Sequence, residues 1–115
     1  MTGVQTCALP IFQVPRVQNA HSGEADEKLK WATLFTRQGL GAFAQLAQSC
    51  AGDYCVGDSV SAADLFVVPQ IYNARRFQLD VAAEFPLLEQ IYQKCFSTPE
   101  CVASSPEKQI DAVTT

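Results

Sequence analysis

Histidine and clustered positive charge are scarce in this chain. His21 is the single histidine among 115 residues, so a tetrahedral zinc site lacks its usual ligands. The longest run of basic residues is Arg75-Arg76, and the formal net charge is −4, which argues against a nucleic-acid surface. No apolar run approaches the roughly 20 residues that a membrane-spanning helix needs. We therefore expect neither a nucleic acid nor a membrane as partner.

The cysteines also lack the patterns that mark a metal site or a disulfide framework. They are odd in number and contain no Cys-x-x-Cys pair; they are Cys7, Cys50, Cys55, Cys95 and Cys101. Cys50, Cys55 and Cys101 have no adjacent basic residue in sequence that would lower their thiol pKa. The pattern favours reduced thiols that pack as small apolar groups in a cytoplasmic protein. A Cys50–Cys55 disulfide remains an open alternative.

The strongest sequence signal for a helix start is at Ser61. Ser61 is typical of an N-cap, and Asp64 three residues later can complete a capping box by reaching back to the Ser61 backbone. Val60 and Leu65 occupy the positions of a hydrophobic staple. The apolar run that follows covers every face of the first turns, which predicts a central, buried helix. The simplest role for Asp64 is therefore structural.

Periodicity predicts further helices and no strands. A long amphipathic helix is expected over 24–49, followed by a loop over 50–60 that has two Gly-Asp turn signals. The second helix is expected over 61–76, with a kink near Pro69. After a connector over 80–84, a third helix begins at Pro86, and a short one begins after Thr98 at Pro99. The nearly half-apolar composition suffices for one core. The fold class is all-α.

The first twelve residues differ from the rest, because they contain no charged side chain and no clear period. The string resembles the translation of a sequencing adaptor read in frame into a transcript. We expect residues 1–12 to be such an artefact or a disordered stretch, residues 13–104 to form one helical domain, and residues 105–115 to be a polar tail. The genuine protein would then extend upstream of residue 12.

Four short motifs resemble the zeta class of glutathione transferases, also known as maleylacetoacetate isomerases. They are Tyr54-Cys55-Val56-Gly57-Asp58, Ser61-Ala62-Ala63-Asp64-Leu65, Val68-Pro69-Gln70 and Asn73-Ala74-Arg75-Arg76-Phe77. The capping box is similar across the C-terminal domains of glutathione transferases, whereas the last two motifs are more specific to the zeta class. The resemblance covers about 18–113. It implies a glutathione-transferase C-terminal-like helical bundle.

The resemblance also implies an activity for the whole protein. Zeta-class proteins isomerise maleylacetoacetate in tyrosine catabolism by reversible addition of glutathione, and they act as homodimers. Their thioredoxin-like domain binds glutathione and carries a Ser-Ser-Cys motif, which this chain does not contain. The resemblance therefore implies a fragment without catalytic residues, which supplies the hydrophobic and carboxylate-binding side of the substrate site. Glutathione would bind mainly to the other domain.

Four residues are candidates for the site through this resemblance. Arg76 matches a family arginine associated with the carboxylate end of the substrate, and Asn73 lies in the same motif. A guanidinium is a bidentate, permanently charged clamp for a carboxylate. A solvated arginine at a helix C-terminus is the alternative. Gln18 and Asn19 match a pair near the glutathione site, or they are two surface amides.

A second function class stays open from the sequence. Helical domains that resemble glutathione transferases also occur alone in translation factors and synthetase complexes, where they mediate protein association. A genuine gene start just upstream of Gln18 would favour such an interaction module. An upstream Ser-Ser-Cys motif would favour the enzyme. Because one fold carries many functions, the activity here depends on analogy.

Overall fold

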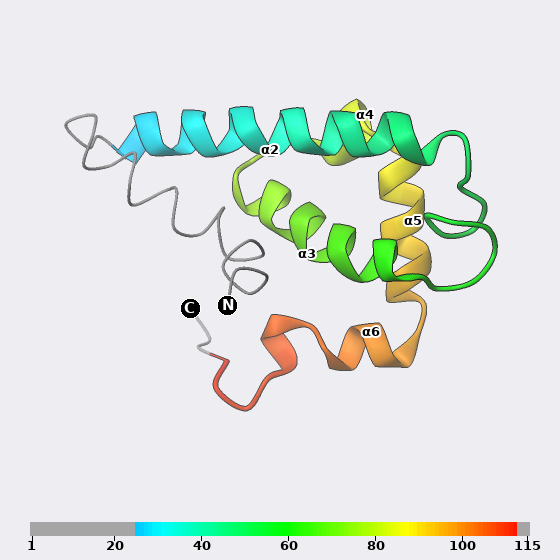
Figure 1. Ribbon diagram of the computed structural model, residues 1–115. Helices are drawn as coiled ribbons and strands as arrows, with labels where there is room; N and C mark the ends of the chain where they lie inside the picture. Colours follow the sequence, from blue (N-terminus) through cyan, green and yellow to red (C-terminus); the bar gives the residue numbers. More distant parts are fainter. Residues whose placement is uncertain (1–24, 113–115) are drawn as a thin grey trace, which may run out of the picture.

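The computed structural model describes residues 25–112, and this part of the chain is helical (Figure 1). Its elements are α2 (Ala25–Ala47), α3 (Ala62–Arg76), α4 (Val81–Glu84), α5 (Pro86–Phe96), α6 (Pro99–Ala103) and the 3-10 turn η1 (Pro106–Lys108). The described residues contain no strand, only one isolated bridge between Ala51 and Gly57. The predicted all-α class is confirmed. Within this part of the chain, no helix is long and apolar enough to cross a membrane.

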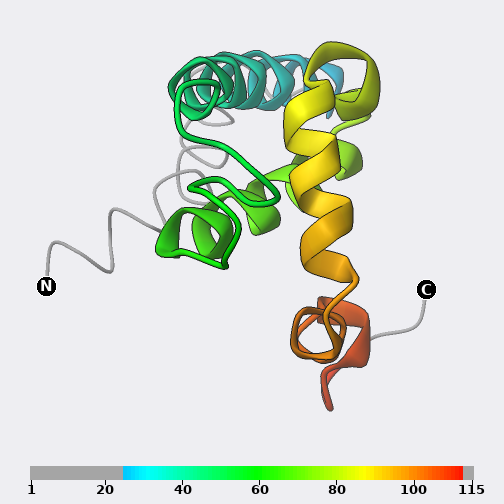
Figure 2. The ribbon, with the colours of Figure 1, turned by 90° about the vertical axis from the view of Figure 1, so that its right-hand side faces the viewer.

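Helix α3 is the centre of the bundle. It contacts α2, α4 and α5, while α5 crosses it and continues towards α6 (Figures 1 and 2). Ile71 and Ala74 of α3 and Leu88 of α5 are fully buried. Burying apolar surface of this kind is the dominant favourable contribution to folding. The core therefore lies mainly between α3 and α5, with Leu79 and Val81 closing its end.

The Ser61 capping box forms as the sequence predicts. The Asp64 carboxylate accepts from the Ser61 backbone N–H at 2.8 Å and from the Ser61 hydroxyl at 3.0 Å. Its other oxygen accepts from the Cys55 backbone N–H at 2.9 Å, across nine residues. Burial raises the pKa of Asp64, but the hydrogen bonds from Cys55 and Ser61 outweigh it and lower the pKa. Asp64 thus joins the preceding loop to the helix start.

The loop before α3 is compact for two local reasons. Gly57 has a φ of 68°, a left-handed conformation that glycine adopts without a steric penalty. A side chain at Gly52 would approach the Gly57 carbonyl oxygen to 2.8 Å, so glycine is required there as well. Backbone hydrogen bonds from Tyr54 to Gly57 and from Gly57 to Cys50 then close the loop. Its Tyr54 and Cys55 side chains are buried in the core.

One expectation about α3 is wrong. The apolar run predicted a helix buried all round, but Leu65 is 69% exposed and Phe66 is 64% exposed. Val60 is also exposed, so the expected staple of Val60 and Leu65 is not buried. Helix α2 contacts α3 but leaves the side chains of Leu65 and Phe66 exposed. Helix α3 continues through Pro69 as a single element.

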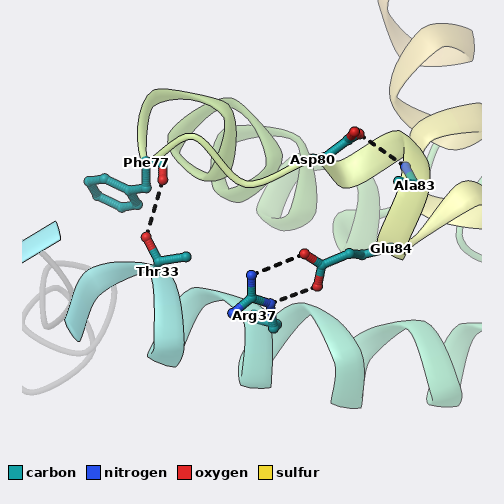
Figure 3. Close-up of polar contacts among 6 residues, drawn as sticks. All are labelled: Thr33, Arg37, Phe77, Asp80, Ala83 and Glu84. Carbon is teal, nitrogen blue, oxygen red and sulfur yellow. Dashed lines mark hydrogen bonds and ion pairs between the residues drawn. The ribbon is translucent and has the colours of Figure 1, made fainter. Parts of the chain in front are cut away.

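The expected connector after α3 is a one-turn helix, α4, because the Asp80 carboxylate accepts from the Ala83 backbone N–H at 3.0 Å. Two polar contacts hold this region against α2 (Figure 3). The Arg37 guanidinium donates to both carboxylate oxygens of Glu84, at 2.7 and 3.0 Å. The Thr33 hydroxyl donates to the Phe77 backbone carbonyl at 3.1 Å. These contacts fix α2 across the end of α3.

The cysteines in the described residues are all free thiols. The Cys50–Cys55 disulfide, which was an alternative from the sequence, is not formed. Instead the Cys50 thiol donates to the Cys55 carbonyl at 3.4 Å. Burial, with the neighbouring Asp64 carboxylate, raises the pKa of Cys55 to about 12. Burial raises the pKa of Cys95 to about 11. Cys55 and Cys95 therefore pack as small apolar groups, as predicted.

Candidate functional site

Two hollows lie on different sides of α3. The first is an apolar groove between α2 and α3, with a volume of about 460 Å³. Five of its eleven lining residues are aromatic: Trp31, Phe35, Phe43, Phe66 and Phe77. Trp31 and Phe35 contact each other, with their ring centroids 4.2 Å apart. We call this hollow the aromatic groove; its character suits an apolar ligand or a packing partner.

The second hollow is polar and lies between α3, α5 and the C-terminal segment. Its volume is about 490 Å³. The lining combines two cations, two phenols and one carboxylate: Tyr72, Arg75, Arg76, Tyr92, Phe96, Ser105 and Glu107. We call it the arginine cleft. Tyr72 and Arg76 are four residues apart on α3, so they share one face of that helix.

Arg75 is exposed, but its guanidinium is bound to neighbouring side chains. Its guanidinium donates to both oxygens of Glu89 at 2.6 and 2.8 Å, and it lies 4.2 Å from the centre of the Tyr92 ring. Burial raises the pKa of Glu89, but hydrogen bonds from Gln93 and Arg75 outweigh it and lower the pKa. The positive charge of Arg75 is therefore largely compensated.

Within the part of the chain that the structure describes, Arg76 differs from its neighbour because no ion pair compensates its charge. Its side chain is exposed and lines the arginine cleft. Among residues 25–112, no carboxylate forms an ion pair with it. Asn73, the other candidate on α3, is half-buried and lines neither the groove nor the cleft. The structure thus brings only Arg76 of this pair to the cleft. Gln18 and Asn19 lie outside the described residues.

Tyr72 and Glu107 are cleft residues that were not among the four site candidates from the sequence. The Tyr72 hydroxyl donates to the Glu107 carboxylate at 2.7 Å. This bond raises the pKa of Tyr72 and lowers the pKa of Glu107. The i, i+4 spacing of Tyr72 and Arg76 was a usable signal for a shared face. Nothing local marks Glu107, which lies 35 residues from Tyr72 in sequence.

Comparison with known proteins identifies the fold family. The family model described as "Glutathione S-transferase, C-terminal domain" matches residues 10–103. The chain belongs to this family. As a glutathione S-transferase C-terminal domain, it is 36% identical over 92 residues to maleylacetoacetate isomerase of Dictyostelium discoideum. It is 39% identical over 88 residues to a glutathione S-transferase of zeta class from Euphorbia esula. The zeta-class resemblance seen in the sequence is confirmed by these names.

Solved structures agree with the relatives. The glutathione S-transferase C-terminal domain described here matches a crystal structure of maleylacetoacetate isomerase from Anaeromyxobacter dehalogenans 2CP-1 with a TM-score of 0.80 and 32% identity. The match covers 88% of this chain and 46% of that enzyme. Another structure of the same enzyme holds dicarboxyethyl glutathione and citrate in its active site.

The chain aligns with only part of each relative. The aligned residues make up 80% of this chain but 42% of the Dictyostelium isomerase, and 76% of this chain but 39% of the Euphorbia protein. The chain therefore spans about two fifths of the length of the curated relatives it matches. This share corresponds to the helical domain alone.

Proposed function

We propose that this chain is the C-terminal part of a glutathione-dependent isomerase or transferase of the zeta class, acting on keto acids of the maleylacetoacetate type. Its role is to supply the hydrophobic and carboxylate-binding side of the substrate site. The uncompensated guanidinium of Arg76 in the arginine cleft supports this role most directly. The names of the relatives support the reaction class.

The described thiols support a reaction that takes its thiol from a co-substrate. Burial raises the pKa values of Cys55, Cys95 and Cys101, so these thiols stay protonated and unreactive near neutral pH. Bound glutathione would supply the thiol for reversible addition to the substrate double bond. We place its binding mainly on the part of the enzyme that this chain lacks, with Gln18 and Asn19 contributing from residues 1–24. The chain contributes no catalytic residue of its own.

Arg76 then acts by binding and orientation. A guanidinium that makes no internal ion pair can accept a carboxylate in a bidentate arrangement, which fixes the position and direction of the substrate. Asn73 lies three residues earlier on α3 but does not line the cleft, so we assign it no direct contact with this carboxylate. The aromatic groove provides apolar surface on the other side of α3.

An Arg76→Ala variant of the complete enzyme tests this proposal. Losing a charge-assisted contact should raise KM for the keto acid about tenfold while kcat changes little, because the contact binds the substrate and takes no part in the chemistry. Lys94→Ala is the matched control, because Lys94 pairs with Asp53 away from the cleft. An unchanged KM in Arg76→Ala would overturn the assignment.

The assembly and location of the complete enzyme follow from the same proposal. We propose a homodimer in the cytoplasm, where free thiols such as the exposed Cys50 persist. The isolated chain should show no turnover with glutathione and substrate, whereas the complete enzyme should be active and should sediment as a dimer. Activity of the isolated chain above the uncatalysed rate would contradict this division of roles.

A further inference from the structure

The arginine cleft contains a carboxylate of the protein itself. Glu107 belongs to η1, and the Tyr72 hydroxyl holds its carboxylate at 2.7 Å. The turn around it is fixed to α6 by hydrogen bonds from the Ser105 hydroxyl to the Val102 carbonyl and from the Gln109 amide to the Ala103 carbonyl. The position of Glu107 is therefore set from two sides, by α3 through Tyr72 and by α6 through the turn.

Of the charged side chains near the cleft, Arg76 and Glu107 are the two that a ligand in the cleft would meet. Arg75 is bound by both oxygens of Glu89. Lys108, next to Glu107 in sequence, lines a different hollow that is formed by Ser97–Pro99 and Val102–Ala103. The positive charge of Arg76 acts on the Tyr72 hydroxyl and lowers its pKa, in opposition to the larger effect of Glu107. Arg76 and Glu107 therefore act on the same phenol.

We propose that Glu107, positioned by Tyr72, determines which anions the arginine cleft accepts. A ligand with one carboxylate at this end pairs with Arg76 and keeps a neutral group towards Glu107. A ligand that brings a second carboxylate into the cleft meets the negative charge of Glu107. The preferred ligand thus has a single carboxylate at the Arg76 end, and the next few atoms of the ligand are uncharged. This inference depends on the proposed function, because it assumes that Arg76 binds the carboxylate.

The expected size of the selection follows from Coulomb's law. Two charges about 6–8 Å apart in a solvent-exposed site repel enough to change a binding constant about threefold. Salt reduces this effect, because the screening length falls from about 10 Å at 0.1 M to about 3 Å at 1 M ionic strength. A selection that acts by charge is therefore modest in size and sensitive to salt.

Fumarate and its monoamide, fumaramate, are suitable probes, because they share one carbon skeleton and differ by one carboxylate. Each is tested as a competitive inhibitor of the complete enzyme. In Glu107→Gln, fumarate should bind about threefold more tightly at low salt and fumaramate should change less. The glutamine keeps an oxygen that can accept from Tyr72, so the turn is retained. Glu100→Gln removes an exposed charge from α6 outside the cleft lining and should alter neither inhibitor.

Tyr72→Phe removes the hydroxyl that positions Glu107 and should reduce the preference for fumaramate while leaving the charge in place. The preference should also decrease in 1 M salt for the unaltered enzyme and stay unchanged for Glu107→Gln. An unchanged ratio of the two inhibition constants in Glu107→Gln would overturn the role of Glu107. If Arg76→Ala weakens both inhibitors in that case, the proposed function still stands. If Arg76→Ala affects neither inhibitor, the proposed function fails, and this inference fails with it.

Discussion

The two sides of α3 are built from similar residues but have different surroundings. Towards α5, Ile71 and Ala74 are 0% exposed and pack with Leu88. Towards α2, Phe66 is 64% exposed and lines the aromatic groove. The composition of α3 therefore does not decide which of its faces is buried. The arrangement of the neighbouring helices decides, since α2 and α5 both contact α3 (Figure 2) but only some of the α3 side chains lie in the core.

The same contrast holds at the glycines. A side chain added at Gly52, in the loop before α3, would approach the Gly57 carbonyl oxygen to 2.8 Å. A side chain added at Gly39, on the wall of the aromatic groove, would meet nothing within 4 Å. Within the described residues, Gly39 therefore has no close packing neighbour. One glycine is thus required by packing and the other is not.

The largest effect should come from a pair of substitutions on the two sides of α3. Ile71→Ala should lower the free energy of unfolding by about 2–5 kcal/mol, because it removes a fully buried side chain and leaves a cavity. Phe66→Ala should change it by about 0.5 kcal/mol or less, because Phe66 is largely exposed. Urea denaturation of the two variants measures the contrast. Equal losses would show that the groove side is covered in solution.

The carboxylate that joins loop and helix should have the next largest effect. Asp64→Ala leaves the Cys55 and Ser61 backbone N–H groups without their acceptor, which should cost about 2–3 kcal/mol. Asp64→Asn keeps one amide oxygen and should lose less. The same denaturation measurement applies to both variants. Equal destabilisation by alanine and asparagine would mean that the charge matters more than the hydrogen bonds.

Protonation at acidic pH should remove the stabilisation that Asp64 provides. Its pKa is lower in the folded protein than in the unfolded chain, so the folded state binds the proton less readily. The stabilisation is therefore complete above the ordinary carboxyl pKa, and it is lost as the pH falls through the lower folded value. Unfolding free energies measured at pH 7 and across the acid range should converge for the unaltered chain and Asp64→Ala. A difference that stays constant with pH would contradict this assignment.

The smallest effect on the free energy of unfolding is expected at Gly39, on the wall of the aromatic groove, and it should be stabilising. Gly39→Ala removes one of the two helix-destabilising glycines of α2 without a clash, so it should raise the free energy of unfolding by about 0.5–1 kcal/mol. Thermal unfolding of the chain measures this gain. Gly52→Ala is the matched comparison and should destabilise the chain. A loss of stability in Gly39→Ala would indicate that a segment outside residues 25–112 packs closely on this helix face.

The features predicted best from the sequence are those encoded by neighbouring residues. The N-cap at Ser61 and the helix starts at Pro86 and Pro99 agree with the structure because each depends on a few adjacent positions. The α4 turn was missed, although Asp80 caps it, because one turn is too short for a periodic pattern to appear. The buried and open sides of α3 could not be separated, because that depends on helices distant in sequence.

The candidate site also depends on contacts between residues that are distant in sequence, which the sequence alone does not predict. Arg76 was found through a resemblance, and Asn73 came with it although it does not line the cleft. The different roles of Arg75 and Arg76 follow from Glu89, which lies 14 residues from Arg75 and gives no local signal. Glu107 was not considered, because its link to Tyr72 spans a turn whose direction only the fold determines. Charge compensation is therefore a property of the folded chain.

The bond between Asp64 and the Cys55 N–H has a consequence for the motions of the protein. A loop of this kind would ordinarily open independently and exchange its amide protons quickly. Here the acceptor of the Cys55 amide belongs to the first turn of α3, so releasing that amide also requires the helix start to open. The Cys55 amide should exchange at a rate close to that of α3 amides and far slower than the neighbouring Val56. Loop and helix would then open together as one cooperative unit.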